Sequence, residues 1–213
     1  MHRCVLTGLM LASVASVSDG SITSTFDSDA EGWSTLNDAQ GFMWRSDVGN
    51  PLGAIRANDI GNGDYWYFAA SDDYKGDLSA FYGGTLSWEL LGIVGNHLDD
   101  EPAEVMVSGA GLMIGIDIDY LPTNGTWAGA EVSLFADSWR LVDDSSDGDL
   151  STTAVTEQQM RDVLADVTGL FIRGEFTTGG DSTALDNVML VPTPASGFLM
   201  GLGSLAMWRR RGS

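Results

Sequence analysis

One loop of the chain carries oxygen donors at a spacing that calcium-binding loops use. Aspartate and serine alternate along it, at Asp143, Ser145, Asp147 and Asp149. These residues would fill the first, third, fifth and seventh places of an EF-hand loop, with Gly148 at the sixth. The twelfth place needs a bidentate glutamate but is Ala154, and no helix is expected before the loop. The spacing therefore favours a solvated acidic loop over a tight calcium loop.

The same residue types give little support for catalysis. His97 stands beside Asp99, Asp100 and Glu101, and no serine or cysteine lies in a recognisable nucleophile elbow. A glycosidase needs two carboxylates at a fixed separation across a cleft. With 30 acidic residues in the chain, any pair could be named, so acid content identifies none. We predict a protein that is not an enzyme, with a glycan hydrolase as the weakest alternative.

Aromatic side chains offer a second kind of chemistry, because the CH groups of a sugar ring stack on flat aromatic faces. The candidates for such a ligand-binding platform are Trp44, Tyr65, Trp66, Tyr67 and Trp127. Core packing is the alternative. Successive side chains of a strand point to opposite faces, so about half of the run 65–68 must face inward. The sequence alone does not tell which half.

The charge balance limits the partners of the protein. Ten basic and 30 acidic residues give a formal net charge of -20 at pH 7. Nucleic acid is excluded as a partner, because phosphate contacts need a basic stripe that this acidic sequence lacks. The single cysteine, Cys4, lies next to the N-terminus, so disulfides do not hold the fold together.

The N-terminus has the pattern of an export signal. His2 and Arg3 precede an apolar run over 5–17, and Ser13-Val14-Ala15 supplies the small residues that signal peptidase recognises. We therefore predict a signal peptide over residues 1–18. Cleavage after Ala15 or after Ser18 fits the pattern equally well.

The C-terminus, 191–213, combines prolines, an apolar run over 197–208 and a basic cluster. The residues that define it are Pro192, Pro194, Arg209, Arg210 and Arg211. The apolar run is shorter than the roughly 20 residues of a membrane span, but terminal arginines can snorkel to the cytoplasmic face. This tail resembles the PEP-CTERM sorting signal of bacterial proteins, with Thr193 where that family usually has glutamate. An apolar terminal helix packed on the core is the alternative.

Between the two ends, short apolar stretches separated by glycine-rich turns predict an all-β fold. Isoleucine and aspartate alternate over 114–120, so isoleucine should face inward. One helix interrupts the strands, because Thr156 and Gln159 have the spacing of a capping box. Its apolar face comprises Met160, Val163, Leu164 and Val167. Gly169 is expected to end this helix.

Several stretches of this central region resemble the laminin B domain, also called laminin IV type A. They are Tyr65-Trp66-Tyr67-Phe68-Ala69-Ala70, Tyr82-Gly83-Gly84-Thr85-Leu86, the segment TEQQMRDVLADVTGLFIRGEF and Leu185-Asp186-Asn187-Val188. The resemblance implies one domain over 21–190, an all-β jelly-roll β-sandwich of the galactose-binding-like type with one short helix. It also implies an extracellular matrix role without catalysis.

A structural calcium ion is the cofactor that this resemblance implies. Related jelly rolls often hold Ca²⁺ where the end of the first strand meets the last strand. Those places offer Asp27, Asp29 and Asp186 here, with Glu31 as a further ligand. The alternative is that the aspartates cap the backbone of their own turns. Asp186 is the strongest candidate, because an acid inside an apolar strand needs a partner.

We expect a non-catalytic exported protein of the bacterial cell surface or extracellular matrix, with an adhesion or structural role and sorted by its C-terminal tail. The alternative is a module that binds carbohydrate, namely exopolysaccharide, through exposed aromatic rings. Expected partners are exopolysaccharide or surface proteins, with signal peptidase and an exosortase-type enzyme acting on the ends. The protein would be secreted or held at the cell surface, with membrane contact through the tail until processing.

Overall fold

The computed structural model describes residues 20–61, 63–94, 102–118, 122, 125–145, 147–177 and 180–193. The predicted signal peptide, His97, Pro194 and the three terminal arginines lie outside the described residues. Within the part that is described, no helix has the length and apolar character needed to cross a membrane.

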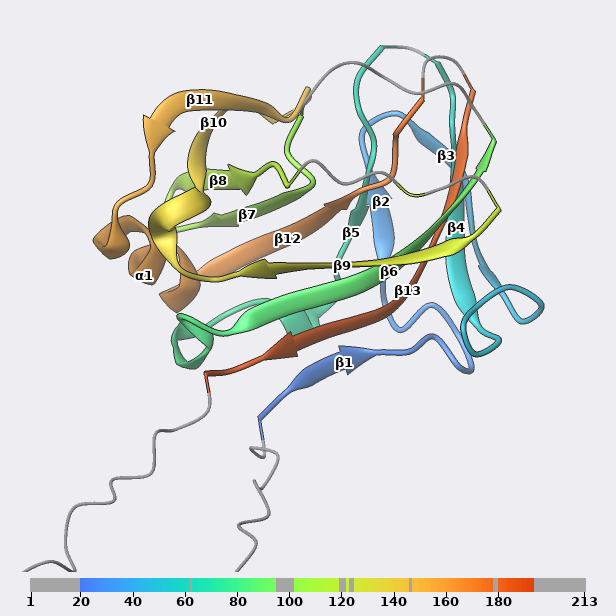
Figure 1. Ribbon diagram of the computed structural model, residues 1–213, viewed down its shortest axis with the longest axis horizontal. Helices are drawn as coiled ribbons and strands as arrows, with labels where there is room; N and C mark the ends of the chain where they lie inside the picture. Colours follow the sequence, from blue (N-terminus) through green and yellow to red (C-terminus); the bar gives the residue numbers. More distant parts are fainter. Residues whose placement is uncertain are drawn as a thin grey trace, which may run out of the picture.

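Two antiparallel sheets pack face to face, with a helix at one end (Figure 1). Sheet A has the strand order β3-β4-β13-β6-β9, with β1 beside β13. Its strands are β1 (Ile22–Ser24), β3 (Ala39–Arg45), β4 (Ala54–Asp59), β6 (Thr85–Val94), β9 (Trp127–Ser133) and β13 (Ser182–Val191). The first and last strands of the chain are thus neighbours.

Sheet B has the strand order β11-β10-β8-β7-β12-β5-β2. Its strands are β2 (Ser34–Leu36), β5 (Tyr67–Ala69), β7 (Val105–Gly109), β8 (Leu112–Ile116), β10 (Arg140–Asp144), β11 (Asp149–Ala154) and β12 (Val167–Arg173). Three short 3-10 turns connect strands, η1 (Asp72–Tyr74), η2 (Ser79–Phe81) and η3 (Ala136–Ser138). The predicted all-β sandwich is confirmed.

The core lies between the inner faces of the two sheets. Leu170 and Ile172 of β12 are buried in it, together with Ile114 of β8, which the alternating pattern over 114–120 predicts to face inward. Trp66 and Trp88 are fully buried there as well. Each such side chain contributes about 1.5–3 kcal/mol through the apolar surface it removes from water.

The helix α1 (Glu157–Ala165) begins as the sequence predicts. The Thr156 hydroxyl accepts a hydrogen bond from the Gln159 backbone N–H, and the Thr156 backbone N–H donates to the Gln159 side-chain oxygen, which completes the capping box. The helix ends before the predicted position, with Asp166 as its C-cap. Val167 already pairs with Gly76 through backbone hydrogen bonds, so Gly169 lies inside β12 and does not end the helix.

Turn chemistry accounts for two of the predicted connections. Gly83 has a φ of 76°, which a side chain would strain, whereas Gly84 is needed because a Cβ there would strike the Val191 carbonyl oxygen. The hairpin of β7 and β8 turns through Ala110 and Gly111, both with positive φ. β8 ends at Ile116, so the strand predicted to continue to residue 120 is shorter than expected.

Candidate ligand surface and buried charge cluster

A second apolar cluster covers the outer face of sheet B. Along β5 and β12, Phe68 and Ile172 point into the core, so the alternate residues Tyr67 and Phe171 point outward. Tyr67, Ala103 and Met106 are buried at the centre of this cluster. Its partly exposed members are Leu36, Tyr65, Met113, Val142, Leu150 and Phe171. We call these six residues the sheet B surface.

Phe171 forms the flat part of this surface. The register aligns it with Ala69 on one side and Met106 on the other. A Cβ on Gly169 would come within 2.6 Å of the ring atom Cζ of Phe171. The ring therefore lies over the Gly169 backbone, two residues back along β12, instead of standing upright on the sheet. Glycine at 169 thus provides the room for a flattened aromatic ring.

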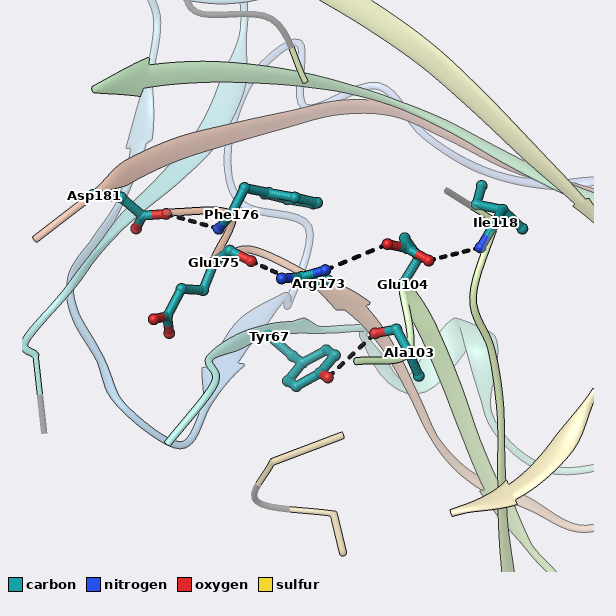
Figure 2. Close-up of polar contacts among 8 residues, drawn as sticks. All are labelled: Tyr67, Ala103, Glu104, Ile118, Arg173, Glu175, Phe176 and Asp181. Atoms are coloured by element: carbon teal, nitrogen blue, oxygen red, sulfur yellow. Dashed lines mark hydrogen bonds and ion pairs between the residues drawn. The ribbon is translucent and has the colours of Figure 1, made fainter. Parts of the chain in front are cut away.

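A buried charged cluster lies at the end of β12, and Figure 2 shows Arg173 between Glu104 and Glu175. Arg173, which is 3% exposed, is paired in register with Tyr67. Its Nη1 atom lies 3.4 Å from the Glu104 carboxylate, and its Nε donates to the Glu175 carbonyl oxygen over 2.5 Å. The guanidinium carbon lies 5.2 Å from the centre of the Tyr65 ring. The cluster thus borders the sheet B surface at the Tyr65 ring.

Three carboxyl groups of this cluster have raised pKa values, mainly because burial disfavours their charged forms. The pKa of Glu104 rises to about 7, although Arg173 opposes the change. The pKa of Glu175 rises to about 8, with further increases from Asp59 and Asp181. Burial also raises the pKa of Asp181 to about 6. A substantial part of the cluster is therefore protonated near neutral pH.

Backbone and aromatic N–H groups hold these carboxylates in place. Glu104 accepts a hydrogen bond from the Ile118 backbone over 2.8 Å. Asp181 accepts one from the Phe176 backbone over 2.9 Å and one from Trp66 Nε1 over 3.2 Å. These bonds tie Glu104 and Asp181 to the backbone on either side of the cluster.

The five aromatic residues predicted as a platform do not gather on one face. Trp66 and Tyr67 are fully buried, so neither ring can stack on a ligand, which corrects the prediction. Trp44 packs against the core and donates from Nε1 to the Phe26 carbonyl oxygen. Trp127 is aligned with Leu91 on sheet A. Only Tyr65 adjoins the sheet B surface.

Phe171 is the surface aromatic that the sequence analysis misses. Leu170 and Ile172 face the core, and strict alternation then leaves Phe171 facing outward. An outward phenylalanine between two inward residues was the available signal, together with Gly169 two residues earlier.

The corner predicted to hold calcium contains one deeply buried acid. Asp186 is fully buried, and its two carboxylate oxygens accept backbone N–H groups of Asn50 and Asn187 over 2.6 and 2.7 Å. Burial raises its pKa to about 6, with smaller increases from the nearby charges of Glu89 and Asp27. The buried Asp186 carboxylate therefore has hydrogen-bond partners, as the sequence analysis requires, and these partners are backbone N–H groups.

The other predicted calcium ligands lie on the surface of this corner. Asp27 accepts from the Thr25 hydroxyl, and Asp29 caps the Glu31 backbone N–H over 2.7 Å, as a turn-forming aspartate does. Across the described ranges, no group of three or more histidine, cysteine, aspartate or glutamate side chains could hold a metal ion. The acidic side chains alone thus do not form a calcium cage, and calcium binding stays a prediction.

Solved structures with the same arrangement place the chain among jelly-roll β-sandwich modules. The L4b domain of human laminin alpha-2 has a TM-score of 0.57 and 15% identity, over 76% of this chain and 96% of that one. A family 11 carbohydrate-binding module of a Clostridium thermocellum cellulosomal cellulase has a TM-score of 0.53 and 14% identity, over 82% and 95%. A Clostridium thermocellum family 11 module in complex with a β-1,3-1,4-mixed-linked tetrasaccharide has a TM-score of 0.54 and 16% identity, and the match covers 81% of this chain and 96% of that one. At such identities the likeness shows the fold alone.

The sequence itself supplies the family. The profile described as Laminin B (Domain IV) matches residues 67–197. The chain belongs to the laminin B (domain IV) family, which confirms the resemblance found in the sequence. No curated protein sequence matches the chain.

Proposed function

We propose that the chain is a non-catalytic module of the cell surface or extracellular matrix that attaches to polysaccharide through the sheet B surface. Membership of the laminin B family supports the extracellular, non-catalytic part. The fold shared with carbohydrate-binding modules supports the sugar ligand as a hypothesis. The observation that carries the proposal is the Phe171 ring, flattened over Gly169 on an outer sheet face.

The sheet B surface has the physical features of a sugar platform. A pyranose ring presents CH groups that pack on an aromatic face, and its hydroxyl groups need polar partners at the rim. The row through Phe171 continues across Met106 and Gly115 to Arg140, which is exposed. Tyr65 adds a second ring at the other end of the cluster. Apolar rings and polar rim groups therefore lie on one face.

Charge restricts the class of polysaccharide. The formal net charge of -20 repels uronate-rich, sulfated or phosphorylated polymers at low ionic strength. Neutral glycans escape this repulsion. We therefore propose a neutral polysaccharide as the ligand.

Polysaccharide retention measured with a panel that includes neutral and anionic polymers tests this function. Phe171→Ala should weaken binding of the retained neutral polymer about tenfold, as expected for about 1.4 kcal/mol of lost stacking. Phe135→Ala is the matched control, because Phe135 is 47% exposed and lies outside the sheet B surface. Absence of binding to every polymer, or equal losses in the two variants, would contradict the proposed site.

Export and sorting belong to the same proposal. A signal peptide over 1–18 would bring the protein out of the cytoplasm, and the tail over 191–213 would direct exosortase-type processing. Replacing Arg209, Arg210 and Arg211 by serine should change the location or the processed mass of the protein in its host. Fractionation and mass spectrometry measure this, and an unchanged location and mass would exclude a sorting role for the arginines.

A further inference from the structure

Carboxyl groups outnumber positive charges at the corner where the end of β12 meets sheet A. The acids come from different elements: Asp59 ends β4, Glu104 precedes β7, Asp117 follows β8, and Glu175 and Asp181 lie between β12 and β13. Arg173 is the guanidinium that Glu104, Glu175 and Asp181 share. We call these six residues the Arg173 corner. One guanidinium balances the charge of about one carboxylate, so the charges of the remaining acids must be compensated in another way.

Each acid of the Arg173 corner faces others across an element boundary. Glu104 faces Arg173 of β12, Asp117 beyond β8 and Tyr67 of β5. Glu175 faces Asp59 of sheet A, Asp181 and Arg173. Burial, together with neighbouring like charges, raises the pKa values of Glu104, Glu175 and Asp181, because like charges in a low-dielectric site repel one another.

The same residues join the two sheets. Asp181 precedes β13 of sheet A, and its carboxylate receives Trp66 Nε1 and the Phe176 backbone N–H. The Asp59 backbone N–H donates to the Asp181 carbonyl oxygen over 3.2 Å. On the sheet B side, the Trp66 backbone N–H donates to Glu175 Oε2 over 3.3 Å. Any movement of these acids apart from one another would loosen the connection between the layers.

We propose that the Arg173 corner is a pH-sensitive latch between the two sheets, closed while the carboxyl groups beyond the one that Arg173 balances hold protons, and loosened when mild alkali removes those protons. The raised pKa values of Glu104 and Glu175, about 7 and about 8, set the range. Because the folded state binds protons that the unfolded chain has already released, stability is highest in mild acid. It falls as the pH rises through the folded-state pKa values.

The latch also reaches the sheet B surface. The Arg173 guanidinium lies beside the Tyr65 ring, and Tyr67, in register with Arg173, donates a hydrogen bond to the Ala103 carbonyl oxygen over 3.2 Å. Loosening the Arg173 corner therefore disturbs the edge of the ligand surface. This second consequence rests on the proposed function, whereas the latch itself does not.

The composition makes the pH range from 6 to 9 unusually informative. Ordinary carboxyl groups have lost their protons by pH 6, and arginine and lysine keep theirs beyond pH 9. The groups with ordinary pKa values in this window are His2, His97, Cys4 and the α-amino group. A marked change of stability in this window thus reports mainly on buried carboxyl groups.

Thermal unfolding of the full chain at pH 6, 7, 8 and 9 tests the latch. Tm should fall by about 5 °C or more between pH 6 and pH 9, and Glu175→Gln should reduce this fall. Glu131→Gln is the matched control, because Glu131 is exposed on sheet A and should leave the slope unchanged. A wild-type Tm that stays constant from pH 6 to 9, or a full slope in Glu175→Gln, would overturn the proposal.

Two further measurements keep the test decisive. If Glu175→Gln does not fold, ¹³C NMR titration of the glutamate carboxyl groups in the wild type tests the proposed latch instead. Midpoints near 7 and 8 support the latch, and midpoints that all lie near the ordinary value of about 4.3 refute it. Polysaccharide retention at the same pH values is scored separately. A pH-dependent Tm without binding to any polymer would retain the latch and reject the proposed function.

Discussion

Two corners of the sandwich bury carboxylates, and they do so in different ways. At Asp186, both oxygens accept backbone N–H groups, from Asn50 and Asn187. At the Arg173 corner, a guanidinium lies among several acids, and the pKa values of Glu104 and Glu175 rise to about 7 and about 8. The first corner uses donors fixed by the backbone, and the second uses a side-chain charge and protons.

The difference predicts how each corner responds to solution conditions. Backbone N–H groups do not titrate, and the Asp186 carboxyl group, with a pKa of about 6, is charged at neutral pH, so its two hydrogen bonds are fully formed there. They also fix the link between β13 and the loop at Asn50, since donor and acceptor are 136 residues apart in the chain. The Arg173 corner changes its charge near neutrality and therefore provides adjustable stability. A small β-sandwich can contain both kinds of buried acid because each kind joins a different pair of structural elements.

Removal of the Arg173 guanidinium should have the largest effect. Arg173→Met leaves Glu104 and Glu175 without their counter-charge in a buried site, which typically costs about 3–5 kcal/mol in the free energy of unfolding. At pH 5 both acids hold protons, so the loss should be clearly smaller than at pH 8. Urea unfolding curves at the two pH values measure the difference.

Arg161→Met is the control for this substitution. Arg161 is 48% exposed, pairs with Glu157 and lies over the Tyr82 ring, an arrangement worth about 1 kcal/mol or less at the surface. Its loss should hardly depend on pH between 5 and 8. An equal loss at both pH values for Arg173→Met would show that protons do not compensate the acids.

Local features of the fold could be predicted from the sequence, because their causes lie within a few residues. The capping box of Thr156 and Gln159 and the apolar helix face of Met160, Val163 and Leu164 appear where the sequence analysis places them. The C-terminal boundary of α1 was wrong because Val167 pairs with Gly76, a contact 91 positions away in the chain. Local patterns cannot report such a partner.

The site was harder to predict for the same reason. The run Tyr65-Trp66-Tyr67 was correctly recognised as half inward, but its register depends on pairing with β12. Which acids surround Arg173 follows from the meeting of β4, β7 and the link after β12. Phe171 was predictable by alternation alone. Long-range strand pairing therefore determines which residues meet in the Arg173 corner, whereas local periodicity determines which residues of β12 face outward.

A smaller effect is expected from the Asp186 corner, and it separates backbone donors from calcium. Asn in place of Asp186 keeps the shape but turns an amide N–H₂ toward one of the two backbone donors. The unmade hydrogen bond should cost about 2 kcal/mol in urea unfolding. This loss should change little in chelator if Asn50 and Asn187 are the whole explanation for the burial.

Calcium would alter that outcome in a recognisable way. An ion bound at 100 times its Kd adds about 2.7 kcal/mol to the folded state, so chelator would lower the Tm of the wild type by several degrees. Asp186→Asn would then lose most of its response to calcium, and its cost would shrink once chelator is present in both proteins. Equal melting of the wild type with calcium and with chelator would reject the predicted ion. The Asp186 corner would then be held by backbone donors alone, because Asp27 and Asp29 are engaged with their own turn.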